Sequence, residues 1–121
     1  MIEKKNNIHT VLLTGASGGL GSELADKISR HCKRLILLGK NKNSLFKIKK
    51  KLQAKYSPIV YKLVAIDFSK KTGVEKAVKF VKKEKRVDVL INCAGTFSVK
   101  SIMNSSYKDL INDFHINFFA P

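Results

Sequence analysis

Four glycines lie close together near the N-terminus, with a spacing that could hold a phosphate group. The stretch reads Thr14-Gly15-Ala16-Ser17-Gly18-Gly19-Leu20-Gly21 and follows an apolar run at residues 11–13. Glycine lets the backbone turn tightly and approach a pyrophosphate, whose charge is met by free N–H groups at the start of the next helix. No Lys-Ser or Lys-Thr pair follows, so this is not a P-loop. A ligand-free turn is the alternative. The expected contacts come from Thr14, Gly15, Ser17, Gly19, Leu20 and Gly21.

A second informative place lies about 20 residues beyond this loop, where dinucleotide folds read the adenosine ribose. Lys40 and Asn41 fall there, and no acidic residue occurs between Asp26 and Asp67. An acid would bind a ribose 2′-hydroxyl and repel a 2′-phosphate, whereas Lys40 offers a cation. We therefore expect NADP(H) rather than NAD(H), with Lys40, Ser17 and Asn41 around the 2′-phosphate. The alternative is that Lys40 is one more surface lysine.

Polar motifs also follow the third and fourth apolar runs. Asp67 and Phe68 follow the third run, and Asn92-Cys93-Ala94-Gly95 follows the fourth. Together with the glycine loop, these positions resemble the short-chain dehydrogenase/reductase family, and 3-oxoacyl-carrier-protein reductases in particular, over the whole chain. The resemblance implies that the aspartate contacts adenine and that the N-N-A-G-like motif lines the cofactor site. The implied cofactor-binding residues are Asp67, Phe68, Asn92, Ala94 and Gly95.

The glycines alone leave the branch of the family open. Gly15, Gly18 and Gly21 also satisfy the T-G-x-x-G-x-x-G spacing of its extended, epimerase-like branch. The motif at residues 92–95 resembles the ordinary reductase branch instead, with Cys93 in place of its second asparagine. A cysteine at a buried strand end is usually inert, so we expect no nucleophile there.

Catalytic residues are the weakest part of the resemblance. Asn117 resembles the asparagine of the family's catalytic tetrad, but the family also needs a serine, and a tyrosine with a lysine four positions later. None of Tyr56, Tyr61 and Tyr107 has that lysine. We expect a chain truncated before these groups and inactive alone. A fragment of a longer reductase is favoured over a truncated gene product or a partner chain that supplies the rest. The three histidines are expected to be packing or surface residues.

The elements that must position these residues alternate between strand-like and helical patterns. This order predicts an α/β fold, with one Rossmann-like, doubly wound parallel sheet that is incomplete and occupies residues 1–121. Strands are expected at 8–14, 34–38, 59–66 and 87–91. A first helix is expected at 19–31, and three more follow these cap residues: Asn41 or Asn43, Ser69 or Thr72, and Ser106 with Asp109. The last helix should bury Leu110, Ile111 and Phe114.

Composition and net charge help to decide between the remaining classes of function. The net charge of +15 would suit nucleic acid, but the lysines are spread over helix faces without interleaved aromatics, so solvated faces are favoured. Cys32 and Cys93 form no metal or disulfide pattern, and no signal peptide or membrane run is present. We expect a cytoplasmic protein that binds a dinucleotide, no metal and no membrane, and that self-associates through the open sheet edge. Its complete form would reduce a small carbonyl or acyl-thioester substrate. The alternative hypothesis is a non-catalytic dinucleotide-binding or interaction module.

Overall fold

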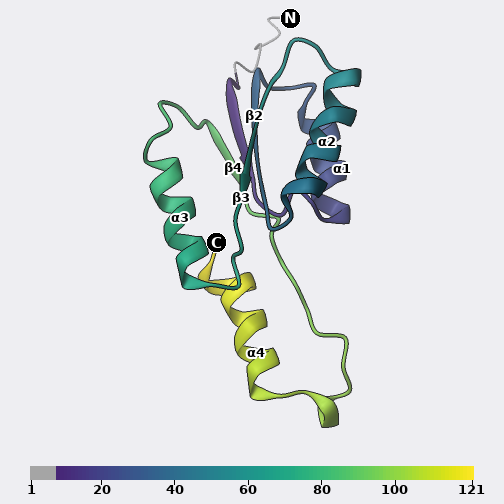
Figure 1. Ribbon diagram of the computed structural model, residues 1–121, viewed down its shortest axis with the longest axis vertical. Coiled ribbons are helices and arrows are strands. Elements are labelled where there is room, and N and C mark those ends of the chain that lie inside the picture. The colour runs from purple at the N-terminus through teal and green to yellow at the C-terminus, as the bar shows by residue number, and fades with distance from the viewer. Residues whose placement is uncertain (1–7) are drawn as a thin grey trace, which may run out of the picture.

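The computed structural model describes residues 8–121. Four parallel strands form one sheet in the order β3-β2-β1-β4, as expected for an incomplete Rossmann-like fold (Figure 1). The strands are β1 (Thr10–Leu13), β2 (Arg34–Gly39), β3 (Val60–Ala65) and β4 (Val89–Ile91). The helices are α1 (Gly19–Ile28), α2 (Lys42–Lys55), α3 (Lys71–Val81) and α4 (Tyr107–Phe114), with short turns η1 (Ile102–Asn104) and η2 (His115–Phe119).

The core consists of two layers because the central strands are apolar on both faces. Leu13 and Leu37 pack with Leu45 of α2 on one face of the sheet. Leu12 and Ile36 belong to a second cluster, on the face that α3 covers. All five side chains are at most 2% exposed. Strands β1 and β2 are therefore anchored from both sides, which fixes the position of the loops that follow them.

Helix starts follow the predicted caps in two cases of three. The Asn41 side chain accepts a hydrogen bond from the Ser44 N–H at 2.9 Å, and Ser106 forms a capping box with Asp109. The prediction for α3 was wrong, because α3 begins after Lys70 without a side-chain cap. The Ser69 hydroxyl is used elsewhere, since it donates to the Asp67 carboxylate at 2.6 Å.

The expected buried face of the last helix is also wrong. Leu110, Ile111 and Phe114 of α4 are 53%, 46% and 50% exposed. Their spacing forms an apolar stripe, but among residues 8–121 it is left about half exposed, with Phe118 of the adjoining turn η2 in edge-on contact with Phe114. Periodicity identified the apolar stripe correctly, but a stripe is buried only where another element covers it.

Beyond Cys93, which packs against the core, the C-terminal segment lies outside the two-layered core. Figure 1 shows the chain leaving β4, running away from the sheet and returning through α4 to the carboxyl ends of the strands. Within residues 8–121, strand β4 pairs with β1 alone, so its outer edge is open there, as predicted from the strand order. Among the described residues, no helix is long and apolar enough to cross a membrane.

Candidate functional site

The glycine loop folds back on itself between β1 and α1. Gly15 has a φ of +66°, and a Cβ there would lie 2.6 Å from the Ala94 backbone. A Cβ on Gly21 would lie 2.0 Å from the Gly15 carbonyl oxygen. Both glycines are therefore required for the loop to pack on itself and on the end of β4. Gly21 thus shapes the loop, and its contact with a phosphate stays a prediction.

Gly19 has a different environment at the first position of α1. A Cβ on Gly19 would meet no atom within 4 Å, and Gly18, the N-cap, supplies no side-chain cap. The first N–H groups of a helix have no intrahelical acceptor, and the helix dipole makes this end positive. The start of α1 thus presents donors to open space, a cradle that a side chain would fill. It fits a pyrophosphate.

Thr14 joins the glycine loop to the motif after β4. Its N–H donates to the Ile91 carbonyl at 3.0 Å, which extends the β1–β4 pairing by one residue. Its hydroxyl oxygen accepts from the N–H groups of Cys93 and Ala94, both at 3.0 Å. Because Thr14 is buried, these bonds hold the two cofactor motifs in a fixed relation.

A cavity of about 650 Å³ opens at the carboxyl ends of the strands, where ligands bind in open α/β sheets. Its size suits a small-molecule cofactor. Most predicted cofactor residues line it: Gly15, Ser17, Gly19, Leu20, Gly21, Lys40, Asp67, Phe68, Ala94 and Gly95. Asn41 does not line the cavity and instead caps α2. Asn112 and Ile116 line it although the sequence did not mark them.

An ion pair lies just beyond β2 and β3, on the side of the cavity where the end of β2 adjoins the glycine loop. Lys40 Nζ lies 3.5 Å from Asp67 Oδ2, and the Lys40 side chain is 74% exposed. Hydrogen bonds from the Ser69 hydroxyl and N–H, with a smaller contribution from Lys40, hold the pKa of Asp67 below its usual value. Asp67 is therefore an anion at neutral pH, and it holds the cation of Lys40 at the mouth of the cavity.

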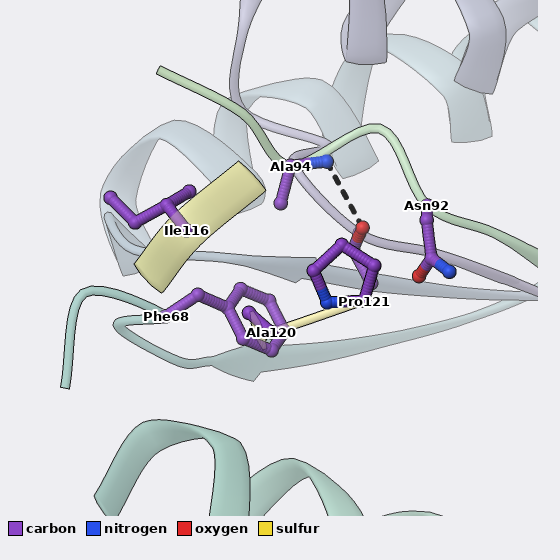
Figure 2. Close-up of a pocket in the computed structure, with 7 residues that line it drawn as sticks. Phe68, Asn92, Ala94, Ile116, Ala120 and Pro121 are labelled. Atoms are coloured by element: carbon purple, nitrogen blue, oxygen red, sulfur yellow. Dashed lines mark hydrogen bonds between the residues drawn. The ribbon is translucent and has the colours of Figure 1, made fainter. Parts of the chain in front are cut away.

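A smaller pocket adjoins this cavity behind the motif at residues 92–95. Thr14, Phe68, Asn92 and Ala94 line it together with the C-terminal turn. Figure 2 shows Phe68 beside Ala120 and near Ile116, with Asn92 on the far side; its dashed line starts at the Ala94 nitrogen. Thr14 and Asn92 thus line this smaller pocket and not the main cavity.

The turn η2 brings two polar side chains to this region. Asn117 accepts from the Thr96 N–H at 2.9 Å and donates to the Thr96 carbonyl at 2.5 Å. His115 Nδ1 lies 2.9 Å from the Phe68 carbonyl oxygen. The expectation that His115 is a packing or surface residue missed this contact, because no local pattern links residues 47 positions apart. Among residues 8–121, no cluster of His, Cys, Asp or Glu could hold a metal ion.

Comparison with known proteins agrees with this geometry. The sequence model of the short-chain dehydrogenase family matches residues 9–121. A diacetyl reductase [(S)-acetoin forming] of Staphylococcus epidermidis is 33% identical over 113 residues, which cover 92% of this chain and 43% of that protein.

Solved structures share the fold at lower identity. A short-chain dehydrogenase of Sphingobium yanoikuyae in complex with NADPH has a TM-score of 0.84 at 23% identity, over 93% of this chain and 44% of that one. A 3-oxoacyl (acyl-carrier-protein) reductase of Agrobacterium tumefaciens with NADP bound has a TM-score of 0.84 at 20% identity, over 99% and 46%.

The protein belongs to the short-chain dehydrogenase family, as the match over residues 9–121 shows. It spans a little under half the length of the relatives it matches.

Proposed function

We propose that this chain is the NADP(H)-binding portion of an oxidoreductase that transfers hydride between a nicotinamide cofactor and a carbonyl or hydroxyl substrate. The single observation that carries the proposal is the cavity of about 650 Å³ between the start of α1 and the Lys40–Asp67 wall. It offers donors for a pyrophosphate at the start of α1 and a cation at Lys40. Family membership supports the reaction class, since diacetyl reductase is among the relatives.

The preference for a 2′-phosphate follows from the charges at the end of β2. Gly39 is the last residue of β2, so Lys40 takes the place where an acid would read a free ribose. A Cβ on Gly39 would lie 2.7 Å from the Ser17 hydroxyl oxygen, so Ser17 stands close beside Lys40. The relatives of known structure that carry NADPH or NADP agree with this preference. Asn41 would contribute through its backbone or by capping α2 beside the phosphate.

Within these residues the proposed roles are binding and positioning. Gly19 and its neighbours would hold the pyrophosphate, Asp67 the adenine side, and residues 92–95 the nicotinamide side. Asn117 is the proposed member of the catalytic set, and it fixes the backbone at Thr96. No tyrosine in the chain has a lysine four positions later. We therefore propose that this domain is truncated before the proton donor, which other residues of the complete protein would supply. Residues 1–121 alone would then not catalyse hydride transfer to a substrate.

We also propose that the protein self-associates. The outer edge of β4 offers unpaired backbone groups, and the α4 stripe of Leu110, Ile111 and Phe114 is about half exposed. A second copy would cover both. Mass measurement in solution tests this, because a monodisperse monomer would contradict it.

The cofactor preference is tested by removing one charge. Lys40→Gln should weaken NADPH binding about tenfold and leave NADH binding nearly unchanged, because a partly exposed charge-assisted contact is lost only with the phosphate. Lys42→Gln is the matched control, since Lys42 is exposed two residues away and does not line the cavity. Titration of intrinsic nucleotide fluorescence measures both.

Equal losses of NADPH and NADH affinity in Lys40→Gln would contradict a role in reading the 2′-phosphate. The same loss in Lys42→Gln would show that only the overall positive charge attracts the cofactor.

A further inference from the structure

The turn η2 contacts the loops that follow the two outermost strands of the sheet. His115 contacts Phe68, just beyond β3, and Asn117 contacts Thr96, just beyond β4. Strands β3 and β4 lie at opposite edges of the sheet. One turn therefore contacts both of these loops, and Phe68 and Thr96 both line the main cavity.

The shape of the turn makes this possible. Ala120 N–H donates to the His115 carbonyl at 2.9 Å, an i→i+5 bond that widens the turn relative to an α-helix. Residues two positions apart on a helix do not face each other, so His115 and Asn117 project in different directions. Ile116, between them, lines both pockets and lies near Phe68 in Figure 2. The turn thus lies between the two loops, with Ile116 against the cavity.

The contact at Phe68 has one chemical reading. A carbonyl oxygen only accepts, so His115 Nδ1 carries the hydrogen and donates it over 2.9 Å. The bonded carbonyl directly follows Asp67, whose carboxylate binds Ser69 and faces Lys40. A change in the position of this peptide would move the whole wall that bears the ion pair.

We infer that His115 is a positioning residue, which holds the segment 67–69 through the Phe68 carbonyl and so sets the affinity for the adenosine half of the cofactor. The effect on cofactor affinity rests on the proposed function. The hydrogen bond from His115 to the Phe68 carbonyl, which we call the tether, is a property of the free protein. His115 touches neither the proposed pyrophosphate cradle nor the proposed nicotinamide side.

Two substitutions at His115 distinguish the contribution of the Nδ1–H donor from that of the aromatic ring. His115→Phe keeps a ring that can pack edge-on against Phe119, as the imidazole does at 6.3 Å, but it cannot donate. His115→Asn loses the ring and keeps an N–H close to the place of Nδ1. Hydrogen–deuterium exchange on the full-length protein without nucleotide reports the tether at the amides of Ser69 and Lys70. Both amides donate to Asp67. Titration with adenosine 2′,5′-bisphosphate reports the affinity.

His115→Phe should accelerate exchange at these two amides and weaken adenosine 2′,5′-bisphosphate by about three- to tenfold, the effect of one lost hydrogen bond. In His115→Asn, the exchange rates at these amides and the affinity for adenosine 2′,5′-bisphosphate should both return towards the wild-type values. Unchanged exchange in His115→Phe, or equal acceleration in both variants, would overturn the tether. Accelerated exchange with unchanged affinity would overturn the positioning role. If the wild type binds no adenine nucleotide while the exchange pattern appears as expected, the tether stands and the proposed function fails.

Discussion

The two walls of the cavity are built on different physical principles. The glycine loop and Lys40 follow strands β1 and β2, whose side chains such as Leu13 and Leu37 are completely buried. In the part of the chain from residue 92 onward, no residue is buried, and polar contacts from His115 and Asn117 hold the backbone. Packing of apolar surface therefore fixes one wall, and a few hydrogen bonds fix the other.

This difference predicts unequal rigidity. Segments with few buried apolar contacts open locally at a lower free energy than the core does. The pyrophosphate cradle should be preformed, because it is attached to the core on both sides. The segment 92–121 should adjust to its ligands, and any element of the complete protein that covers α4 would stabilise it.

The largest expected effect comes from truncating one side chain in each of the two regions. Leu37→Ala should reduce the free energy of unfolding by about 3 kcal/mol, since Leu37 is 0% exposed within a packed cluster. Phe118→Ala should change it by less than about 0.5 kcal/mol, because Phe118 is 72% exposed. Urea unfolding of both variants measures the contrast. Comparable losses would show that the C-terminal segment is part of the core.

A smaller effect distinguishes two glycines of the same loop. Gly21→Ala should destabilise the fold by about 2 kcal/mol, because its Cβ would lie 2.0 Å from the Gly15 carbonyl oxygen and force the loop to move. Gly19→Ala should be neutral or slightly stabilising, because its Cβ would meet nothing within 4 Å. Thermal unfolding of the pair decides this. If Gly19→Ala were the more damaging change, the described geometry of the loop would be wrong.

The smallest effect concerns the point where α3 is attached to the sheet. Glu84 accepts from Arg34 of β2 and Lys62 of β3, both at 2.6 Å, and these bonds lower the pKa of Glu84 from 4.5. A carboxyl with a lowered folded-state pKa stabilises the fold above pH 4.5 and loses this contribution as the pH falls through the folded-state value. Glu84→Gln should therefore cost about 1.5 kcal/mol at pH 7, and the difference from wild type should vanish in acid.

The matched control for Glu84 is an exposed pair. Asp26→Asn removes the 2.8 Å ion pair with Lys55, whose side chain is 48% exposed, and should change stability little at any pH. Urea unfolding from pH 7 to pH 3 measures both variants. A pH-independent loss in Glu84→Gln would show that its effect is one of packing and not of charge.

The sequence predicted the central strands and two of the helix starts well because their signals are local. Apolar runs marked β1 and β2, and the cap at Asn41 and the capping box at Ser106 needed only neighbouring residues. The glycine loop was identifiable for the same reason. The sequence could not show which glycine faces its own loop and which faces open space, since Gly19 and Gly21 differ only in their three-dimensional surroundings.

The failures depend on contacts that residue type and spacing do not reveal. Leu110 and Phe114 have the spacing of a buried helix face, but burial depends on an element that covers them. Ser69 is a good cap residue by type, yet the carboxylate of Asp67 binds its hydroxyl. His115 meets Phe68 across 47 positions, and no pattern in a single sequence reports such a contact.

The central claim is that the start of α1 holds the phosphates of NADP(H), and one substitution tests it most directly. Gly19→Val places a side chain near the first N–H groups of α1, where its Cβ would meet no atom within 4 Å. Glu23→Val is the matched control, since Glu23 is exposed on the same helix and does not line the cavity. Calorimetric titration with NADPH should show binding by the wild type and by Glu23→Val, and a loss of at least about tenfold in Gly19→Val with an unchanged melting temperature. Equal NADPH affinity in all three proteins would contradict the assignment of the cavity as a dinucleotide site.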